Sequence, residues 1–83
     1  MPALLIKTDI PPEELRRLAS REDDARVARR LLALASALDG TPRAAAAKVA
    51  GMDTQTLRDW VIRYNRGGAT ALTVPGVRDG RAA

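Results

Sequence analysis

The chain has 83 residues, a formal net charge of +4, and neither cysteine nor histidine. This composition excludes disulfide bonds and the usual zinc sites, and no apolar run reaches the roughly 18 residues that a membrane-spanning helix requires. A chain of this length buries only about 60% of its unfolded surface. We therefore expect one small domain, with a thin core because 16 of its residues are alanine.

Residues 1–10 are predicted to form an N-terminal arm. Leu4, Leu5 or Ile6 is expected to lie on the core, and a short strand is the alternative. The apolar run is too short for a signal peptide and lies on the wrong side of its positive charge. Together with the absence of cysteine, this favours a cytoplasmic protein.

A first helix is predicted after this arm. Pro11 and Pro12 open it, because proline suits the first helical position, and two glutamates follow where the helix dipole favours acidic side chains. Its apolar face comprises Leu15, Leu18 and Ala19, and its end is expected between Ser20 and Glu22.

A longer helix is predicted from Ala25 to about Leu38, capped by Asp23 or Asp24. Its buried stripe is expected to contain Val27, Ala28, Leu31, Leu34, Ala35 and Leu38. Arg26, Arg29 and Arg30 are predicted to face solvent, with Glu22 pairing with Arg26. Asp39 and Gly40 close the helix.

The stretch from Thr41 to Arg66 has the pattern of a helix-turn-helix. Thr41 is predicted to cap its first helix, Pro42 to occupy the first helical position, and the alanine-rich run to Ala50 to continue it. Gly51 suits a left-handed turn, and Ala47, four residues earlier, is small enough for two helices to cross closely.

The second helix of this pair is predicted from Gln55 to about Asn65. Asp53 or Thr54 caps it, and Gly67 and Gly68 end it. One face is apolar and comprises Leu57, Trp60, Val61 and Tyr64. The opposite face carries Gln55, Asp59, Arg63 and Arg66, with Thr56 and Arg58 flanking it. Such polar and cationic side chains suit a helix inserted in a major groove, whereas an ordinary helical hairpin with a solvated face is the alternative.

The positive charge is concentrated in the second half of the chain. Residues 1–39 carry seven basic and seven acidic side chains, whereas residues 40–83 carry seven basic and three acidic ones, which accounts for the whole net charge of +4. A polyanionic partner is the simplest explanation for a basic half that also contains the helix-turn-helix.

The residues after Arg66 are rich in glycine and lack a clear amphipathic pattern. Leu72 and Val74 are expected to pack back against the domain, and residues 75–83 to form a mobile tail, with Arg78 and Arg81 either solvated or in a minor groove. These elements predict an all-α, homeodomain-like helix-turn-helix bundle of about four helices over residues 11–68, followed by a flexible linker or tail over residues 69–83.

Nothing in the sequence supports catalysis or a cofactor. The acidic residues are expected to be surface caps and helix-face residues, and neither an inward-facing metal-binding group nor a phosphate-binding Gly-Lys-Ser/Thr loop is present. We therefore expect no enzymatic activity, no cofactor, no small-molecule substrate and no membrane partner.

The run DARVARRLLALASALDGTPRAAAAKVAGMDTQTLRDWVIRYNRGG resembles the N-terminal DNA-binding domain of mariner-related bacterial insertion-sequence transposases. Members of that family often carry a pattern like ARRLLAL…GxSRxxAAxxAGMDRQTLRDWVxRYNxxG. The residues that stand at matching places are Arg29, Arg30, Leu31, Leu32, Gly40, Arg43, Ala46, Ala47, Ala50, Gly51, Met52, Asp53, Thr56, Leu57, Arg58, Asp59, Trp60, Val61, Tyr64, Asn65 and Gly68. The resemblance covers roughly residues 13–72.

In such transposases this domain binds the terminal inverted repeats, and a second DNA-binding region and an RNase H-like catalytic domain with a magnesium-binding acidic triad follow it. The resemblance therefore implies double-stranded DNA as the partner, with terminal inverted repeats as the target and a catalytic transposase chain as a further partner. We therefore expect this chain to be a truncated element, the first frame of a split gene, or a domain with a new use.

Candidate DNA-contacting residues follow from this assignment. The candidate base-contacting residues are Gln55, Thr56, Arg58, Asp59 and Arg63, because glutamine pairs with adenine, arginine with guanine, and aspartate accepts from cytosine. The candidate phosphate contacts are Thr41, Arg43, Lys48, Thr54 and Arg66. A protein-interaction adaptor or antitoxin-like partner, and a standalone transcription regulator that would need a dimer, are the alternative functions.

Overall fold

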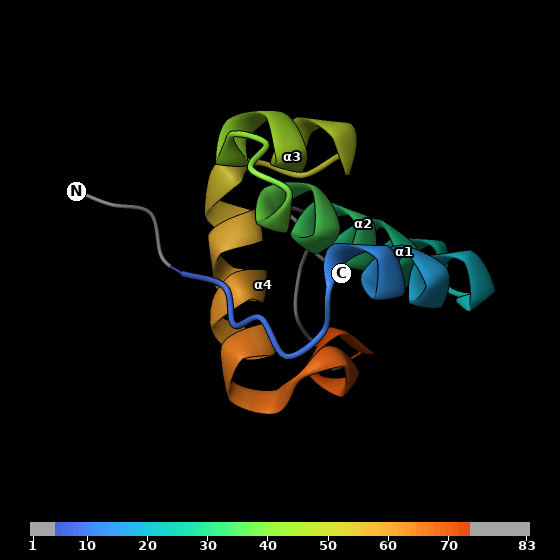
Figure 1. Cartoon of the computed structure of the whole chain (residues 1–83). Coiled ribbons are helices and arrows are strands. Elements are labelled where there is room, and N and C mark those ends of the chain that lie inside the picture. Colours follow the sequence, from blue (N-terminus) through green and yellow to red (C-terminus); the bar gives the residue numbers. More distant parts are fainter. Residues whose placement is uncertain (1–4, 74–83) are drawn as a thin grey trace.

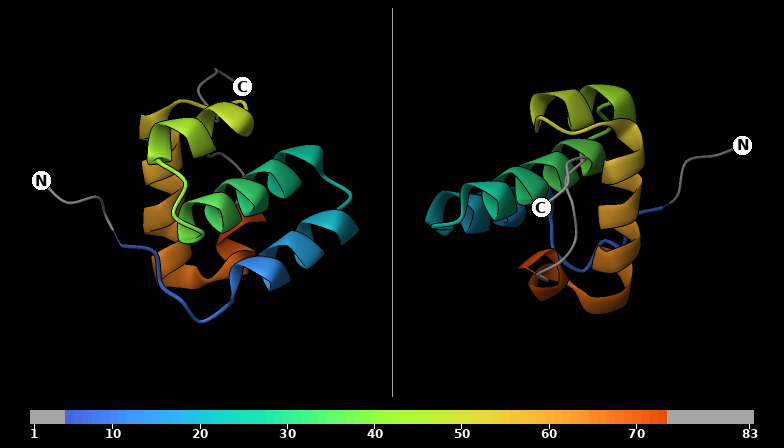
Figure 2. Two further views of the ribbon diagram at one scale, coloured as in Figure 1. Left: turned by 45° about the horizontal axis from the view of Figure 1, so that its top comes forward. Right: turned by 180° about the vertical axis from the view of Figure 1, so that it is seen from behind.

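A computed structural model of the chain describes residues 5–73. The regular structure of this part is helical: α1 (Pro12–Arg21), α2 (Ala25–Leu38), α3 (Arg43–Val49), α4 (Thr54–Gly67) and a short 3-10 helix, η1 (Ala69–Thr73). Helices α1 and α2 run side by side, and α4 crosses the end of α2 steeply (Figures 1 and 2). The predicted all-α helix-turn-helix bundle is thus confirmed.

The first two helices form a hairpin whose ends follow from their local sequence. Pro12 stands at the start of α1 with Glu13 and Glu14 in its first turn, and Asp24 caps α2 by accepting from the Arg26 N–H at 2.9 Å. This bond lowers the pKa of the Asp24 carboxyl. Arg26 also forms its ion pair with Asp24, at 3.6 Å, and not with Glu22 as predicted, because the Glu22 carboxylate accepts from the Asp24 N–H.

Helices α2 and α3 end in the same hydrogen-bonded motif. At the end of α2, the Thr41 N–H donates to the Ser36 carbonyl and the Gly40 N–H to the Ala37 carbonyl. The prediction that Thr41 caps α3 is wrong, since its N–H completes the end of α2 and the chain enters α3 one residue later, with Pro42 as a cap that has no side-chain hydrogen bond. Pro42 instead offers its carbonyl, which accepts from the Ala46 N–H at 2.9 Å.

The turn between α3 and α4 is the predicted left-handed one. Gly51 has φ of +76°, its N–H donates to the Lys48 carbonyl, and the Met52 N–H donates to the Ala47 carbonyl at 3.0 Å. This Schellman pattern is usually accompanied by an apolar contact between the residue after the glycine and the helix's last turn. Met52 and Ala47 are both buried, which fits that rule.

Substituting Gly51 tests this turn. Gly51→Val is expected to lower the free energy of unfolding by about 1–3 kcal/mol, because a β-branched residue is strained at positive φ. A Cβ at this position would meet no atom within 4 Å, so the loss would come from the backbone conformation alone. Gly51→Asn is the matched control and should lose less, since asparagine tolerates this region better. Equal stability of the valine variant and the wild type in urea unfolding would contradict the assignment.

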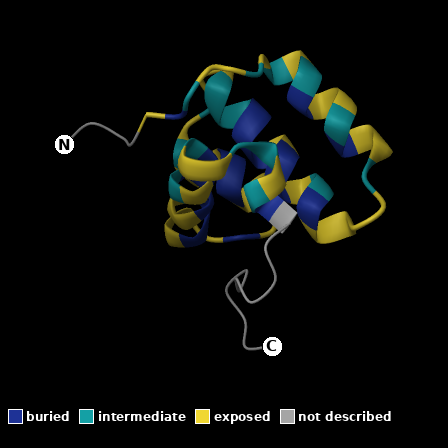
Figure 3. Ribbon diagram, turned by 90° about the horizontal axis from the view of Figure 1, so that it is seen from below, coloured by how far each residue is buried: buried dark blue, intermediate teal, exposed yellow. Residues whose placement is uncertain are grey.

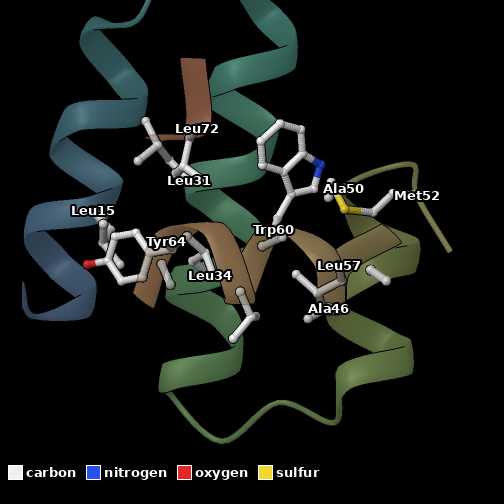
Figure 4. Packing of buried hydrophobic residues seen from close by; sticks show 14 of the residues in the cluster. Leu15, Leu31, Leu34, Ala46, Ala50, Met52, Leu57, Trp60, Tyr64 and Leu72 are labelled. Atoms are coloured by element: carbon white, nitrogen blue, oxygen red, sulfur yellow. The ribbon is translucent and has the colours of Figure 1, made fainter. Parts of the chain in front are cut away.

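Helix α4 supplies the largest side chains of the core. Leu57, Trp60, Val61 and Tyr64 are all buried, as their spacing predicts. Figure 4 shows Trp60 pointing from α4 toward α2, Tyr64 toward Leu15 of α1, and Leu57 beside Ala46 of α3. Buried residues line the inward side of each helix (Figure 3). The side chains of α4 therefore hold the other three helices together.

Arg30 is buried, and the prediction that it faces solvent is wrong. The residue is 6% exposed, its guanidinium carbon lies 4.1 Å from the centre of the Trp60 ring, and Nη1 donates to the Leu72 carbonyl at 2.7 Å. The planar guanidinium stacks on the ring through a cation–π interaction while its edge keeps a hydrogen-bond partner. Arg30 thereby connects α2, α4 and η1.

The segments on either side of the four helices also pack against them. Leu72 of η1 is fully buried, as predicted, so the packed part of the chain continues beyond α4. At the other end, Ile6 is buried whereas Leu5 is exposed. Predictions for Leu4, Val74 and residues 75–83, including Arg78 and Arg81, lie outside the described residues.

Candidate nucleic-acid interface

Helix α4 presents one polar face to solvent. Thr54, Gln55, Arg58, Asp59, Arg63 and Arg66 are all exposed there, opposite the buried stripe that contains Trp60. The helix has 14 residues, which corresponds to about 21 Å, and a major groove about 12 Å wide admits such a helix. The structure thus brings together six of the ten predicted contact residues on one exposed helix face.

The start of α4 is fixed by Asp53. Its carboxylate accepts from the Thr56 N–H at 2.7 Å, and this bond, with a further one to the Thr56 side chain, lowers the pKa of Asp53. Thr56 is only 7% exposed, so its predicted exposure beside the base-contacting face is wrong. The reason is its position: Thr56 precedes Trp60 by four residues and shares its buried side, and its side chain turns back to the cap.

The three predicted phosphate contacts that precede the turn differ in position and in exposure to solvent. Lys48 is exposed in the last turn of α3, whereas Arg43, at the start of α3, and Thr41 are half-buried. Helix α3 packs directly against α4 and α2. Lys48 is therefore the best placed of the three for a charged contact outside the domain, and Thr41 the least, since it has no charge and its N–H is already bonded to Ser36.

Two side chains of the α4 face are bonded to each other. Gln55 Nε2 donates to Asp59 Oδ1 at 3.3 Å, one helical turn along. The remaining charged side chains of this face are arginines, so that the helix carries three basic residues against Asp59. The electrostatic character of the face is positive, which suits a phosphate-lined groove.

The N-terminal arm crosses the C-terminal half of α4 (Figure 1). Asn65 binds it from both sides, because its Nδ2 donates to the Leu5 carbonyl at 2.7 Å and its Oδ1 accepts from the Lys7 N–H at 2.9 Å. Lys7 Nζ lies 5.6 Å from the centre of the Tyr64 ring. The arm therefore lies beside the later turns of α4, and the turns from Thr54 to Arg63 contain most of the exposed polar face.

Sequence reasoning missed two residues that position this face. Arg30 holds η1 against Trp60, and Asn65 holds the arm against α4. A signal existed for each: Arg30 lies three residues after Val27 and four before Leu34, within the buried stripe, and both Arg30 and Asn65 stand at matching places in the transposase-like pattern.

Comparison with known proteins supports a helix-turn-helix assignment. A protein-family model described as winged helix-turn helix matches residues 30–83, most of the chain. Within residues 5–73 the regular structure is helical, so the helix-turn-helix is the part of that description visible there.

A curated protein of Sinorhizobium fredii (strain NBRC 101917 / NGR234), described as uncharacterized protein y4pG/y4sC, is 44% identical over 80 residues. That match covers 96% of this chain and 42% of the relative. No solved structure matches the chain. Among the described residues, no helix is both long and apolar enough to cross a membrane.

Proposed function

This chain belongs to the winged helix-turn-helix family, and we propose that it is a sequence-specific DNA-binding module that places the exposed face of α4 in a major groove. The observation that carries the proposal is the two-sided character of α4. One side is buried as the centre of the core, and the other presents glutamine, aspartate and three arginines to solvent. In helix-turn-helix proteins, the N-terminal residues of the second helix contact base edges.

The finer proposal is that the target is a terminal inverted repeat of an insertion sequence. The resemblance to mariner-related transposase domains supports it, and it implies a catalytic transposase chain as a further partner. Under this proposal the module binds DNA without itself catalysing a reaction, in the cytoplasm. The chain covers 42% of its curated relative, whose printed description gives no activity.

Two kinds of variant should behave differently if this proposal is correct. Lys48→Ala and Arg66→Ala are expected to weaken binding to all duplexes alike and to lower the slope of log affinity against log salt by about one unit each, because each removes a phosphate contact. Gln55→Ala and Arg58→Ala are expected to cost about 1–3 kcal/mol on the preferred duplex only, because they remove a contact to one base pair.

Fluorescence anisotropy with a duplex selected from a random pool, and with its scrambled counterpart, provides the measurement. The matched control is Arg17→Ala, which removes the same charge from an exposed position on α1, where Arg17 pairs with Glu14 at 3.2 Å. This control should bind both duplexes nearly as the wild type does. A loss with Arg17→Ala as large as that with Lys48→Ala would show that total charge, and not the α4 face, governs binding.

A further inference from the structure

A hydrogen bond joins Gln55 and Asp59, two residues of the exposed α4 face that carry no positive charge. Both side chains are exposed, and they lie four residues apart, where side chains on a helix are neighbours. Asp59 stands on the same helix as Arg58, Arg63 and Arg66. Within residues 5–73 the ion pairs join other residues, and the contact described for the Asp59 carboxylate is its bond with the Gln55 amide.

The chemistry of the two groups fixes the orientation of the amide. An ionised carboxylate only accepts hydrogen bonds, so the end of the Gln55 amide that faces Asp59 must be its nitrogen. That nitrogen carries two hydrogens, and one of them is used by Asp59. When Asp59 takes the hydrogen anti to the amide oxygen, the other hydrogen stays beside that oxygen, and this pair is available to a base.

This remaining pair matches one base. Adenine presents an N6–H donor and an N7 acceptor in the major groove, and a glutamine amide binds both at once, with its oxygen accepting from N6 and its nitrogen donating to N7. Guanine presents two acceptors at the corresponding places, which suits a donor pair instead. A Gln55 amide that is held by Asp59 and directed into the groove therefore favours adenine.

We propose that Asp59 is a positioning residue that orients the Gln55 amide for adenine, and that it does not itself contact a base. The inference rests on the proposed function, since it concerns the same face of α4. It assigns Asp59 a role different from the direct cytosine contact predicted from sequence. The free protein already has the bond, so the Gln55 amide loses less orientational freedom when DNA binds than an amide without such a partner would lose.

The test needs the base pair that Gln55 contacts. Selection of preferred duplexes from a random pool, with the wild type and with Gln55→Ala, identifies it as the position at which the variant loses its preference. Asp59→Ala is then expected to reduce the preference for adenine over guanine at that position by about twofold to tenfold. The reason is that the Gln55 amide is no longer held in the free protein and must be immobilised when DNA binds, and immobilising one side chain weakens binding by about this factor. Its affinity for unrelated duplexes should rise, because a negative charge has been removed from the face.

Asp59→Asn is the matched control. It removes the same charge as Asp59→Ala, but its amide oxygen can still accept from Gln55, so the preference for adenine should be retained. In a Gln55→Ala background, Asp59→Ala should have no further effect at this base pair, which a double-mutant cycle measures. A merely structural role in α4 would move thermal stability but would not depend on Gln55 in this way.

Several outcomes would overturn the proposal. Asp59→Ala could shift the preference at a different base pair, which would indicate direct contact by Asp59. Equal loss with Asp59→Asn and Asp59→Ala would assign the effect to charge, and a specific wild type in which Gln55→Ala changes no position would remove Gln55 as a base contact. A wild type without any sequence preference would instead reject the proposed function, and this inference with it.

Discussion

Replacing Trp60 with alanine is expected to lower the free energy of unfolding by about 3–5 kcal/mol, the usual range for a buried large aromatic side chain. Trp60 is fully buried, and its ring points from α4 toward α2 (Figure 4). Its removal leaves a cavity and also takes away the ring on which Arg30 stacks. Domains typically have about 5–15 kcal/mol of total stability, so a loss of this size removes a large part of it.

Thermal unfolding followed by circular dichroism checks this expectation. Tyr64→Phe on the same buried stripe is the matched control. Within the described residues the Tyr64 hydroxyl is buried without a hydrogen-bond partner, and burial raises its pKa. Removing an unpaired buried hydroxyl should leave stability close to that of the wild type or increase it. An unchanged melting temperature for Trp60→Ala would contradict the placement of this stripe in the core.

The second large effect is expected for Arg30. Arg30→Ala should lower the free energy of unfolding by about 2–4 kcal/mol, because it removes a charged hydrogen bond and a cation–π contact and leaves the Leu72 carbonyl without this donor. Arg30→Lys should restore only part of the loss, since an ammonium group cannot stack on Trp60 and offer a planar edge to Leu72 at the same time.

Arg29→Ala is the control for this measurement. Arg29 is the preceding residue on α2, it carries the same charge, and it is exposed. Denaturant unfolding should show a change within about 0.5 kcal/mol for this variant, as is usual for surface substitutions. Equal losses for the two arginines would mean that charge on α2, and not the contacts of Arg30 with Trp60 and Leu72, determines the effect.

The sequence predicts what local interactions decide. The Asp24 and Asp53 caps, the positive φ of Gly51 and the buried stripe of α4 each depend on residues within a few positions of one another, and all are confirmed. Capping and periodicity are properties of a single helix, so they can be inferred before the helices are packed together.

The contacts that were missed join distant parts of the chain. The Arg30 bond to Leu72 spans 42 residues, and the Asn65 bonds to Leu5 and Lys7 span 60 and 58. The sequence pattern places Arg30 on the solvent face, because its partners lie far along the chain and become apparent only once η1 has folded back. The same limit applies to Thr41, whose role depends on how the end of α2 leads into α3.

For the candidate interface, the sequence predicts the helix and most of its exposed residues. Gln55, Arg58, Asp59, Arg63 and Arg66 lie on one face, as their spacing requires. The predicted place of Thr56 flanking that face is wrong, because its position four residues before Trp60 puts it on the buried side. Periodicity was the better guide there, and DNA contact by the other residues stays a prediction.

The central claim is that the α4 face binds DNA and distinguishes sequences. Titration of the wild-type protein with a selected duplex and with its scrambled counterpart, each at two salt concentrations, tests it most directly. We expect binding to both duplexes that weakens steeply with salt, because phosphate contacts release counterions, and tighter binding to the selected duplex at each salt concentration. Equal affinity for the two duplexes would contradict sequence recognition, and no binding to either at low salt would contradict DNA binding itself and favour a protein partner.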